Sequence, residues 1–184
     1  MKVSVFSFIV VSIFFWTCGP GKSVAPEQIE ALNRMVSQKD FTIEVNAIYP
    51  QITNSMQQVF NAGLFPRGSN LSRIDVSADG YYLKMMKDSV DVFLPFYGER
   101  HFGGGYDSSN TGIQFKALAK NLKISKNKKS NGYTLRFDAS KRAENYQIQI
   151  HLTPGTNTNI LVNSMSRTGI MYTGNTVSKT VTSE

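Results

Sequence analysis

Strict alternation of apolar and polar residues in the second half of the chain is the feature that most constrains the fold. Tyr133, Leu135, Phe137 and Ala139 alternate with polar residues, and the same pattern repeats over residues 146–152. Successive side chains of a strand point to opposite faces of a sheet, so each segment has one apolar and one wet face. A wet face on each strand is typical of antiparallel sheets. The two segments therefore predict neighbouring antiparallel strands.

Further strand patterns recur along the chain, separated by turn signals such as Asp79-Gly80, Asn131-Gly132 and Ala143-Glu144-Asn145. We predict these strands at residues 41–47, 71–77, 82–87, 90–94, 113–117, 122–126, 159–164 and 169–172. Short connections without intervening helices favour an antiparallel meander, so the predicted fold class is mainly β. A meander packed on itself forms a two-sheet sandwich or a partly open barrel, and the sequence leaves both open.

One N-terminal helix is predicted over residues 26–38. Pro26 suits a first helical turn. Ile29, Leu32 and Val36 share one face at helical spacing. We therefore expect this helix to pack its apolar face against the sheet.

The remaining segments complete a single domain over residues 26–174. Residues 49–70 are irregular, with two prolines and two glycines, and have room for a short helix around residues 56–60. Residues 175–184 are polar, and we expect them to fray as a tail.

The first eighteen residues predict that the protein is exported from the cytoplasm. Lys2 precedes an apolar run from Val3 to Trp16, which is short for a membrane span and typical of a secretory signal. Cys18, the only cysteine, stands where that run stops. A bacterial lipoprotein signal is cut just before a cysteine whose thiol then carries lipid. We therefore predict that residues 1–17 are a signal peptide and that Cys18 is the lipid attachment site. The alternatives are an ordinary signal peptide cut a few residues later and an uncleaved anchor.

Cleavage before Cys18 would leave 167 of the 184 residues, with 19 Lys and Arg against 13 Asp and Glu. That length suits one domain, with residues 18–25 as a lipid-anchored tether. A basic chain ordinarily suggests nucleic acid, but export removes that partner and favours anionic lipid or glycan surfaces. We expect the protein to be anchored at the outer membrane, facing the periplasm.

A long aromatic and glycine-rich loop follows Pro95, and it is the predicted binding surface. Its candidate residues are Tyr97, Glu99, Arg100, His101, Phe102 and Tyr106. Rings beside hydrogen-bonding groups suit a sugar or a small amphiphile. The same composition describes a loop pinned to the sheet edge by its rings, which is the favoured interpretation because long loops need packed rings to stay ordered.

No pattern in the sequence indicates an enzyme or a cofactor site. His101 with Glu99 and Asp107 could hold a metal, but one imidazole and two loop carboxylates at irregular spacing are a weak signal. We predict no metal, no cofactor and no catalytic residue. A glycan hydrolase ranks below a binding protein and a structural protein.

A basic segment lies between two predicted strands and carries Lys120, Lys123, Lys126, Lys128 and Lys129. The favoured interpretation is a solubilising turn whose lysines guard a sheet edge, since the sequence has no second basic patch. Electrostatic contact with an anionic envelope surface is the alternative.

Five segments occur in the order found in a known family. They are residues 36–47, 88–98, 112–115, 126–133 and 163–174. The more specific parts are Leu94, Pro95, Tyr97 and Gly98, and the ending with Arg167 and Tyr172. Together they resemble the domain-of-unknown-function family 4251 over about residues 36–176. The resemblance implies an exported, mainly β protein of Gram-negative anaerobes, and it implies no activity and no catalytic residue.

We therefore expect a lipid-anchored cell-envelope protein that binds a ligand or an envelope protein on a β scaffold. The alternative is a purely structural envelope component without a small-molecule site. A concave pocket lined by the loop's rings would favour binding, and rings packed flat on the sheet would favour the structural role.

Overall fold

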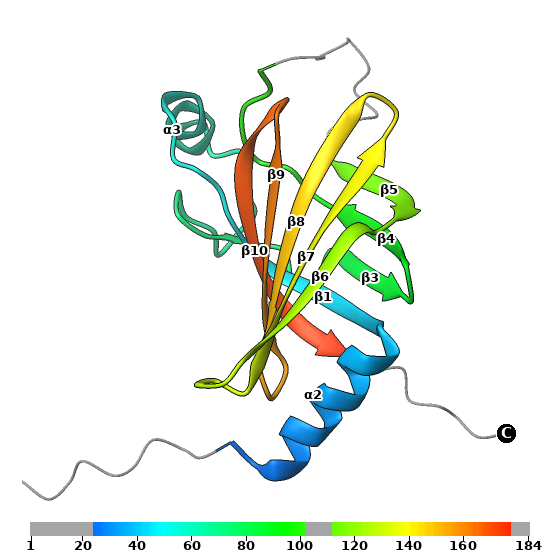
Figure 1. The fold of residues 1–184 in the computed structure, drawn as a ribbon. Coiled ribbons are helices and arrows are strands. Elements are labelled where there is room, and N and C mark those ends of the chain that lie inside the picture. Colours follow the sequence, from blue (N-terminus) through cyan, green and yellow to red (C-terminus); the bar gives the residue numbers. More distant parts are fainter. Residues whose placement is uncertain (1–23, 102–111, 178–184) are drawn as a thin grey trace, which may run out of the picture.

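Ten antiparallel strands in residues 24–101 and 112–177, the residues that the computed structural model describes, form a single sheet. The sheet rolls into a nearly closed barrel (Figure 1). Its strand order is β5-β4-β3-β1-β10-β9-β8-β7-β6, and the short β2 pairs with β1. The fold is mainly β and antiparallel, as predicted. Of the two arrangements that the sequence left open, the structure has the barrel-like one, because one sheet continues through all the strands.

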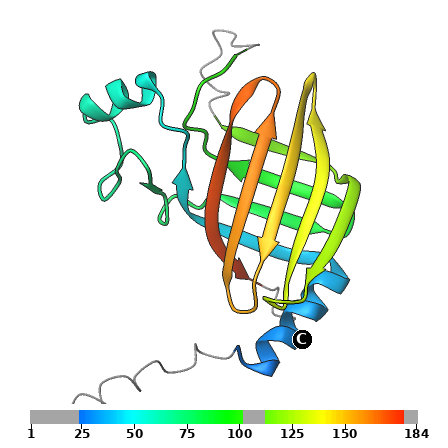
Figure 2. The ribbon, with the colours of Figure 1, turned by 60° about the vertical axis from the view of Figure 1, so that its left-hand side comes forward.

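The first half of the barrel contains β1 (Asp40–Tyr49), β2 (Ile74–Asp75), β3 (Tyr82–Met86), β4 (Ser89–Leu94) and β5 (Ile113–Leu118). The second half contains β6 (Lys120–Asn127), β7 (Gly132–Lys141), β8 (Glu144–Leu152), β9 (Asn157–Ser164) and β10 (Arg167–Val177). Figure 2 shows the long strands of the second half crossing steeply in front of the first half.

Most strand boundaries differ by one or more residues from those predicted, and three of the differences bear on the fold. The strand expected over residues 71–77 is only the two residues of β2. Glu144 and Asn145, expected in a turn, already belong to β8, where they pair with Lys141 and Ser140. β10 continues to Val177, three residues into the expected tail, because it pairs with β1 over that length.

The meander breaks between β5 and β6, which are consecutive in the chain but lie at opposite ends of the strand order. A single residue, Ala119, joins them, and a hairpin loop usually needs about two residues or more. The chain turns a corner instead, and a register shift between Lys120 and Lys123 follows at once. Such bulges bend a strand. The corner carries β5 across the barrel to lie against β7.

The barrel interior is apolar, as the alternating pattern predicted. Leu135, Ile150 and Leu83 are completely or almost completely buried. Phe115 of β5 stacks on Tyr146 of β8, with ring centroids 5.0 Å apart. This contact joins the two halves of the barrel face to face.

Two short helices flank the barrel, one more than the single N-terminal helix of the predicted fold class. α2 (Pro26–Gln38) has the predicted bounds, and it buries Leu32 and Val36 at one end of the barrel. α3 (Asn54–Asn61) lies in the irregular segment, and Thr53 caps it by accepting a hydrogen bond from the Met56 N–H at 3.3 Å. No helix in the described ranges is long and apolar enough to cross a membrane.

Candidate functional site

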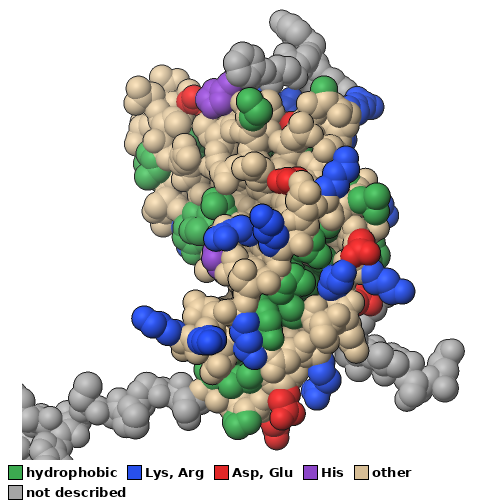
Figure 3. Space-filling view, in the orientation of Figure 1, with side chains coloured by type: hydrophobic (Ala, Val, Ile, Leu, Met, Phe, Trp, Pro, Cys, Tyr) green, Lys and Arg blue, Asp and Glu red, His purple; other side chains and the backbone are tan. Residues whose placement is uncertain are grey.

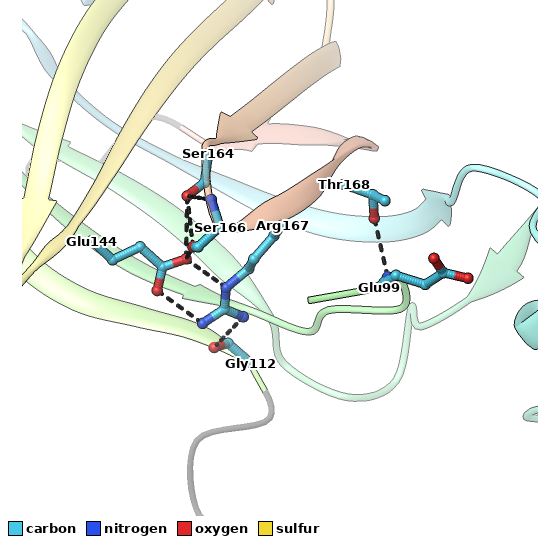
Figure 4. Close-up of polar contacts among 7 residues, drawn as sticks. All are labelled: Glu99, Gly112, Glu144, Ser164, Ser166, Arg167 and Thr168. Carbon is cyan, nitrogen blue, oxygen red and sulfur yellow. Dashed lines mark hydrogen bonds and ion pairs between the residues drawn. The ribbon is translucent and has the colours of Figure 1, made fainter. Parts of the chain in front are cut away.

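The segment after β4 and the start of β10 lie side by side at the end of the barrel away from α2 (Figures 1 and 4). The His101 N–H donates to the Ser166 carbonyl oxygen at 2.8 Å, and the Thr168 N–H donates to that of Glu99 at 3.0 Å. The Glu99 N–H donates to Thr168 Oγ1 at 3.2 Å. We call this pairing of residues 99–101 with residues 166–168, together with the side chains of Arg167 and Glu144, the clasp.

Arg167 is the centre of the clasp, and only 4% of its surface is exposed. Its Nε and Nη2 donate to the two carboxylate oxygens of Glu144 at 2.7 and 3.1 Å (Figure 4). Its Nη1 donates to the Gly112 carbonyl oxygen at 3.3 Å. The guanidinium carbon lies 5.0 Å from the centroid of the Phe96 ring. Because it contacts residues 96 and 112, Arg167 holds both ends of the long loop.

The Glu144 carboxylate is charged at neutral pH although its surroundings are partly dry. Burial alone would raise its pKa, but hydrogen bonds from Arg167, Ser166 and Tyr146 and the charge of Arg167 outweigh burial and lower the pKa to about 2. Ser164 Oγ also donates to this carboxylate, at 3.2 Å. The polar groups of the clasp therefore satisfy one another.

A second buried contact fixes the end of β4. The Tyr172 hydroxyl donates to the Pro95 carbonyl oxygen at 2.8 Å, and no part of Tyr172 is exposed. Gly98 follows three residues after Pro95, and a side chain at this position would collide with Thr168 Oγ1 and with the Phe96 ring. The segment from Leu94 to Gly98 and the segment from Arg167 to Tyr172 are thus in contact, and each holds the other in place.

The same segment also lines a pocket of about 400 Å³. We call it the aromatic pocket; its lining residues are Tyr81, Phe93, Leu94, Pro95, Phe96, Tyr97, Gly112 and Gln114. Rings support one another around it: the Tyr81 and Phe93 centroids are 5.2 Å apart, and Tyr97 meets Phe65 edge-on at 6.0 Å. A concave, ring-lined hollow of this size is typical of a small-molecule site.

Three polar side chains of the aromatic pocket take no part in the hydrogen bonds that hold the described residues together. Within the described part of the chain, the side chains of Tyr81, Tyr97 and Gln114 make no hydrogen bond of their own. Burial, with a smaller effect of Asp79, raises the pKa of Tyr81, and burial also raises the pKa of Tyr97. Both phenols are therefore neutral donors at neutral pH.

A larger hollow of about 610 Å³ lies on the outer face of β6 to β9. Four of its polar side chains pair with one another: Asn121 Nδ2 donates to Asp138 Oδ2 at 2.8 Å, and Arg136 Nε donates to Gln149 Oε1 at 2.6 Å. The aromatic pocket offers unpaired polar atoms beside rings, so it is the better candidate despite its smaller volume.

The predicted loop residues are divided between these features. Tyr97 lines the aromatic pocket and is half-buried. Hydrogen bonds from Thr53 and Ser55 lower the pKa of Glu99, so this carboxylate lies at the start of α3. The backbone of Arg100 forms a β-bridge with Arg167, while His101 is exposed.

The other candidates lie outside the described residues: Phe102, Tyr106, Asp107 and Cys18, the predicted site of lipid attachment. In the ranges that are described, no group of three His, Cys, Asp or Glu side chains could hold a metal ion.

Sequence reasoning missed Glu144, Tyr81, Phe93 and Gln114. Glu144 has no local signal, because its partner Arg167 lies 23 residues later. Tyr81 immediately precedes β3, and Phe93 belongs to the neighbouring strand β4, so their approach depends on the pairing of these strands.

Comparison with known proteins agrees with the architecture. A domain of unknown function, DUF4251, matches residues 24–176. A search of curated proteins found no match. The crystal structure of a DUF4251 family protein from Bacteroides eggerthii is similar, with a TM-score of 0.55 and 12% sequence identity over 83% of this chain and 88% of that one. At this identity the likeness to that protein shows the fold alone. The family match includes both segments of the clasp and nearly all of the barrel, and the chain therefore belongs to the DUF4251 family.

Proposed function

We propose that this chain is a lipid-anchored cell-envelope protein that binds a small ligand, of sugar or amphiphile type, in the aromatic pocket. The observation that carries the proposal is the combination of rings with three polar side chains that the fold leaves unpaired: Tyr81, Tyr97 and Gln114. A ligand with one apolar face and one or two hydroxyl or carbonyl groups would match it. The short apolar segment ending at Cys18 supports export and anchoring.

The ligand is tested by native mass spectrometry of the full chain isolated from bacterial membranes. The wild type should retain a non-covalent mass that denaturation releases, and Gln114→Ala should lose it. Gln147→Ala is the matched control, because Gln147 is also an exposed strand amide but lies outside the aromatic pocket. A wild type without any adduct, or an adduct kept equally by Gln114→Ala, would count against the pocket.

The lipid anchor is tested separately, by labelling cells with an alkyne fatty acid. The wild type should be tagged and Cys18→Ala should not. Equal tagging of the two chains would exclude Cys18 as the attachment site.

A purely structural envelope component is the second candidate, and the clasp is the observation that favours it. The base of the long loop is held by backbone hydrogen bonds, which a rigid structural element needs as much as a binding site does. The double variant Phe102→Ala/Tyr106→Ala separates the two roles. If the rings are packed, the melting temperature should fall steeply, because buried aromatic truncations cost about 3–5 kcal/mol. If they contact a ligand, stability should change little and ligand retention should fall.

A further inference from the structure

All of the net charge of the chain lies in one hairpin. Residues 116–137 contain seven Lys and Arg and no Asp or Glu, whereas the rest of the chain contains thirteen of each sign. The net charge of +7 is thus the charge of this segment. It forms the end of β5, all of β6 and the start of β7. In the chain cleaved before Cys18, which lacks Lys2, the remainder has twelve Lys and Arg against thirteen Asp and Glu, so a nearly neutral remainder leaves the field of this segment directional.

Most of these cations are exposed and unpaired. Seven of the eight residues of β6 are exposed, and β6 is the last strand in the order of the sheet. Lys116 pairs with Asp91 at 3.1 Å, and Arg136 with Gln149. Within the described ranges, Lys120, Lys123, Lys128 and Lys129 have no side-chain partner, so the fold does not account for them.

The tip of this hairpin is fastened to α2, the helix that the tether enters. Lys126 Nζ and the Tyr133 hydroxyl both donate to Asn33 Oδ1, at 3.2 and 2.7 Å. Figure 1 shows the β6–β7 turn and the start of α2 at the same end of the molecule, and Figure 3 shows Lys and Arg side chains projecting there. Lys128 and Lys129 in that turn therefore lie near the end of the domain that leads back to Cys18.

We propose that the β6–β7 turn rests on an anionic phospholipid surface and sets the orientation of the domain; this rests on the proposed lipid anchor. The eight residues of the tether, 18–25, reach at most about 28 Å, so an anchor alone would leave the domain free to turn. Each lysine near an anionic surface strengthens attachment by about fivefold. A lipid chain together with a basic patch is a common pair of membrane signals.

The acidic side chains at this end of the domain do not cancel the positive charge of the β6–β7 turn. Glu27 and Glu30 of α2 are exposed near its start, and Arg34 follows on the same helix. With Lys126, Lys128 and Lys129, the described charges at this end sum to a positive value. The field of such a small cluster falls off within about 8–10 Å at physiological salt, so it acts only when the turn is close to the lipid.

The test measures how fast each lysine reacts with an amine-labelling reagent in the full chain, held in lipid nanodiscs. One set contains phosphatidylcholine alone, and the other contains about one third phosphatidylglycerol. Lys128 and Lys129 should react several-fold more slowly in the anionic discs, and 0.5 M salt should abolish the difference, because screening shortens the field. Lys87, in the β3–β4 turn, should react equally in both.

A variant pair sharpens the test. Lys128→Gln/Lys129→Gln should remove the slowing at Lys126, whereas Lys84→Gln/Lys87→Gln removes the same charge elsewhere and should keep it. If both kinds of disc hold the chain and the turn lysines are labelled at equal rates in both, the proposed orientation is wrong and the lipid anchor is unaffected. Slowing in both kinds of disc would overturn the charge-based contact. A chain that stays with neither kind of disc would contradict the anchor and the orientation together.

Discussion

The clasp and the aromatic pocket, which share Phe96 and Gly112, use their polar side chains in opposite ways. On the clasp side, Arg167 and Glu144 are largely buried, and the polar atoms are bound to one another or to backbone carbonyls. In the aromatic pocket, Tyr97 and Gln114 keep polar atoms that bind nothing within the described residues. Buried polar groups without partners are costly, so a fold satisfies them where burial is complete. The polar atoms of Tyr97 and Gln114 are open to solvent, so the fold does not need to satisfy them and they remain available to a ligand.

The contrast implies that the clasp holds the fold and that the aromatic pocket is available for binding. The clasp and the aromatic pocket are linked through Phe96, whose ring packs against the Arg167 guanidinium and also lines the pocket. A change at Arg167 should therefore loosen the pocket, while a change at Gln114 should not loosen the clasp.

The largest expected effect on stability is that of Arg167→Ala. The substitution leaves the Glu144 carboxylate without its bidentate partner and the Gly112 carbonyl without its donor. Breaking a buried pair by removing one member costs about 3–5 kcal/mol. Urea unfolding of the full chain should show this loss. Arg73→Ala breaks the exposed pair with Asp75 and should cost much less stability. Equal losses in the two variants would contradict the claim that the clasp stabilises the fold more than an exposed ion pair does.

Tyr172→Phe should have the next largest effect. The ring still fits, but the buried Pro95 carbonyl loses its donor, which costs about 1–3 kcal/mol. Tyr133→Phe is the matched control, because its hydroxyl bonds Asn33 at a half-exposed position where water can replace it. Thermal unfolding should rank the two in that order, and the reverse order would contradict the importance given to the Pro95 contact.

Acid should weaken the clasp through Glu144. Its folded pKa of about 2 lies below the unfolded value of about 4.3, so the unfolded chain binds the extra proton first. The stability from this group is complete above about pH 5 and is lost as the pH falls toward 2. Glu144→Gln should flatten the decline of the urea midpoint between pH 6 and pH 3. A decline as steep as that of the wild type would assign acid sensitivity to other carboxylates.

The smallest expected change in stability is at the pocket. Tyr97→Phe removes only a hydroxyl without a partner in the described residues, so the free energy of unfolding should change by less than about 0.5 kcal/mol. Retention of a bound molecule should nevertheless fall. A stability loss like that of Tyr172→Phe would show that Tyr97 belongs to the structural side of the comparison.

Local patterns predicted the elements better than their assembly. Pro26 with an apolar stripe placed α2, and alternation placed β7 and β8, because both signals lie within one turn or one strand. The choice between sandwich and barrel depended on Ala119, where a one-residue link forces a corner. No periodicity reports how distant strands pair, so the position of β1 between β3 and β10 was not predictable.

The candidate site, like the fold, depends on contacts between distant segments that local sequence patterns do not reveal. The block ending at Gly98 and the ending from Arg167 were singled out by resemblance, and the structure brings them together. Glu144 was taken for a turn residue, because a polar triplet looks the same whether or not a buried arginine lies 23 residues away. The aromatic loop was found from its composition, but its division into a clasp side and a pocket side required coordinates. Export, lipidation at Cys18 and outer-membrane location stay predictions.

Hydrogen exchange at the His101 and Thr168 amides tests most directly whether the clasp and the pocket are separate, since both N–H groups are bound across the clasp. We expect slow exchange in the wild type and in Gln114→Ala, and fast exchange in Arg167→Ala. Fast exchange in Gln114→Ala, or continued protection in Arg167→Ala, would contradict that separation.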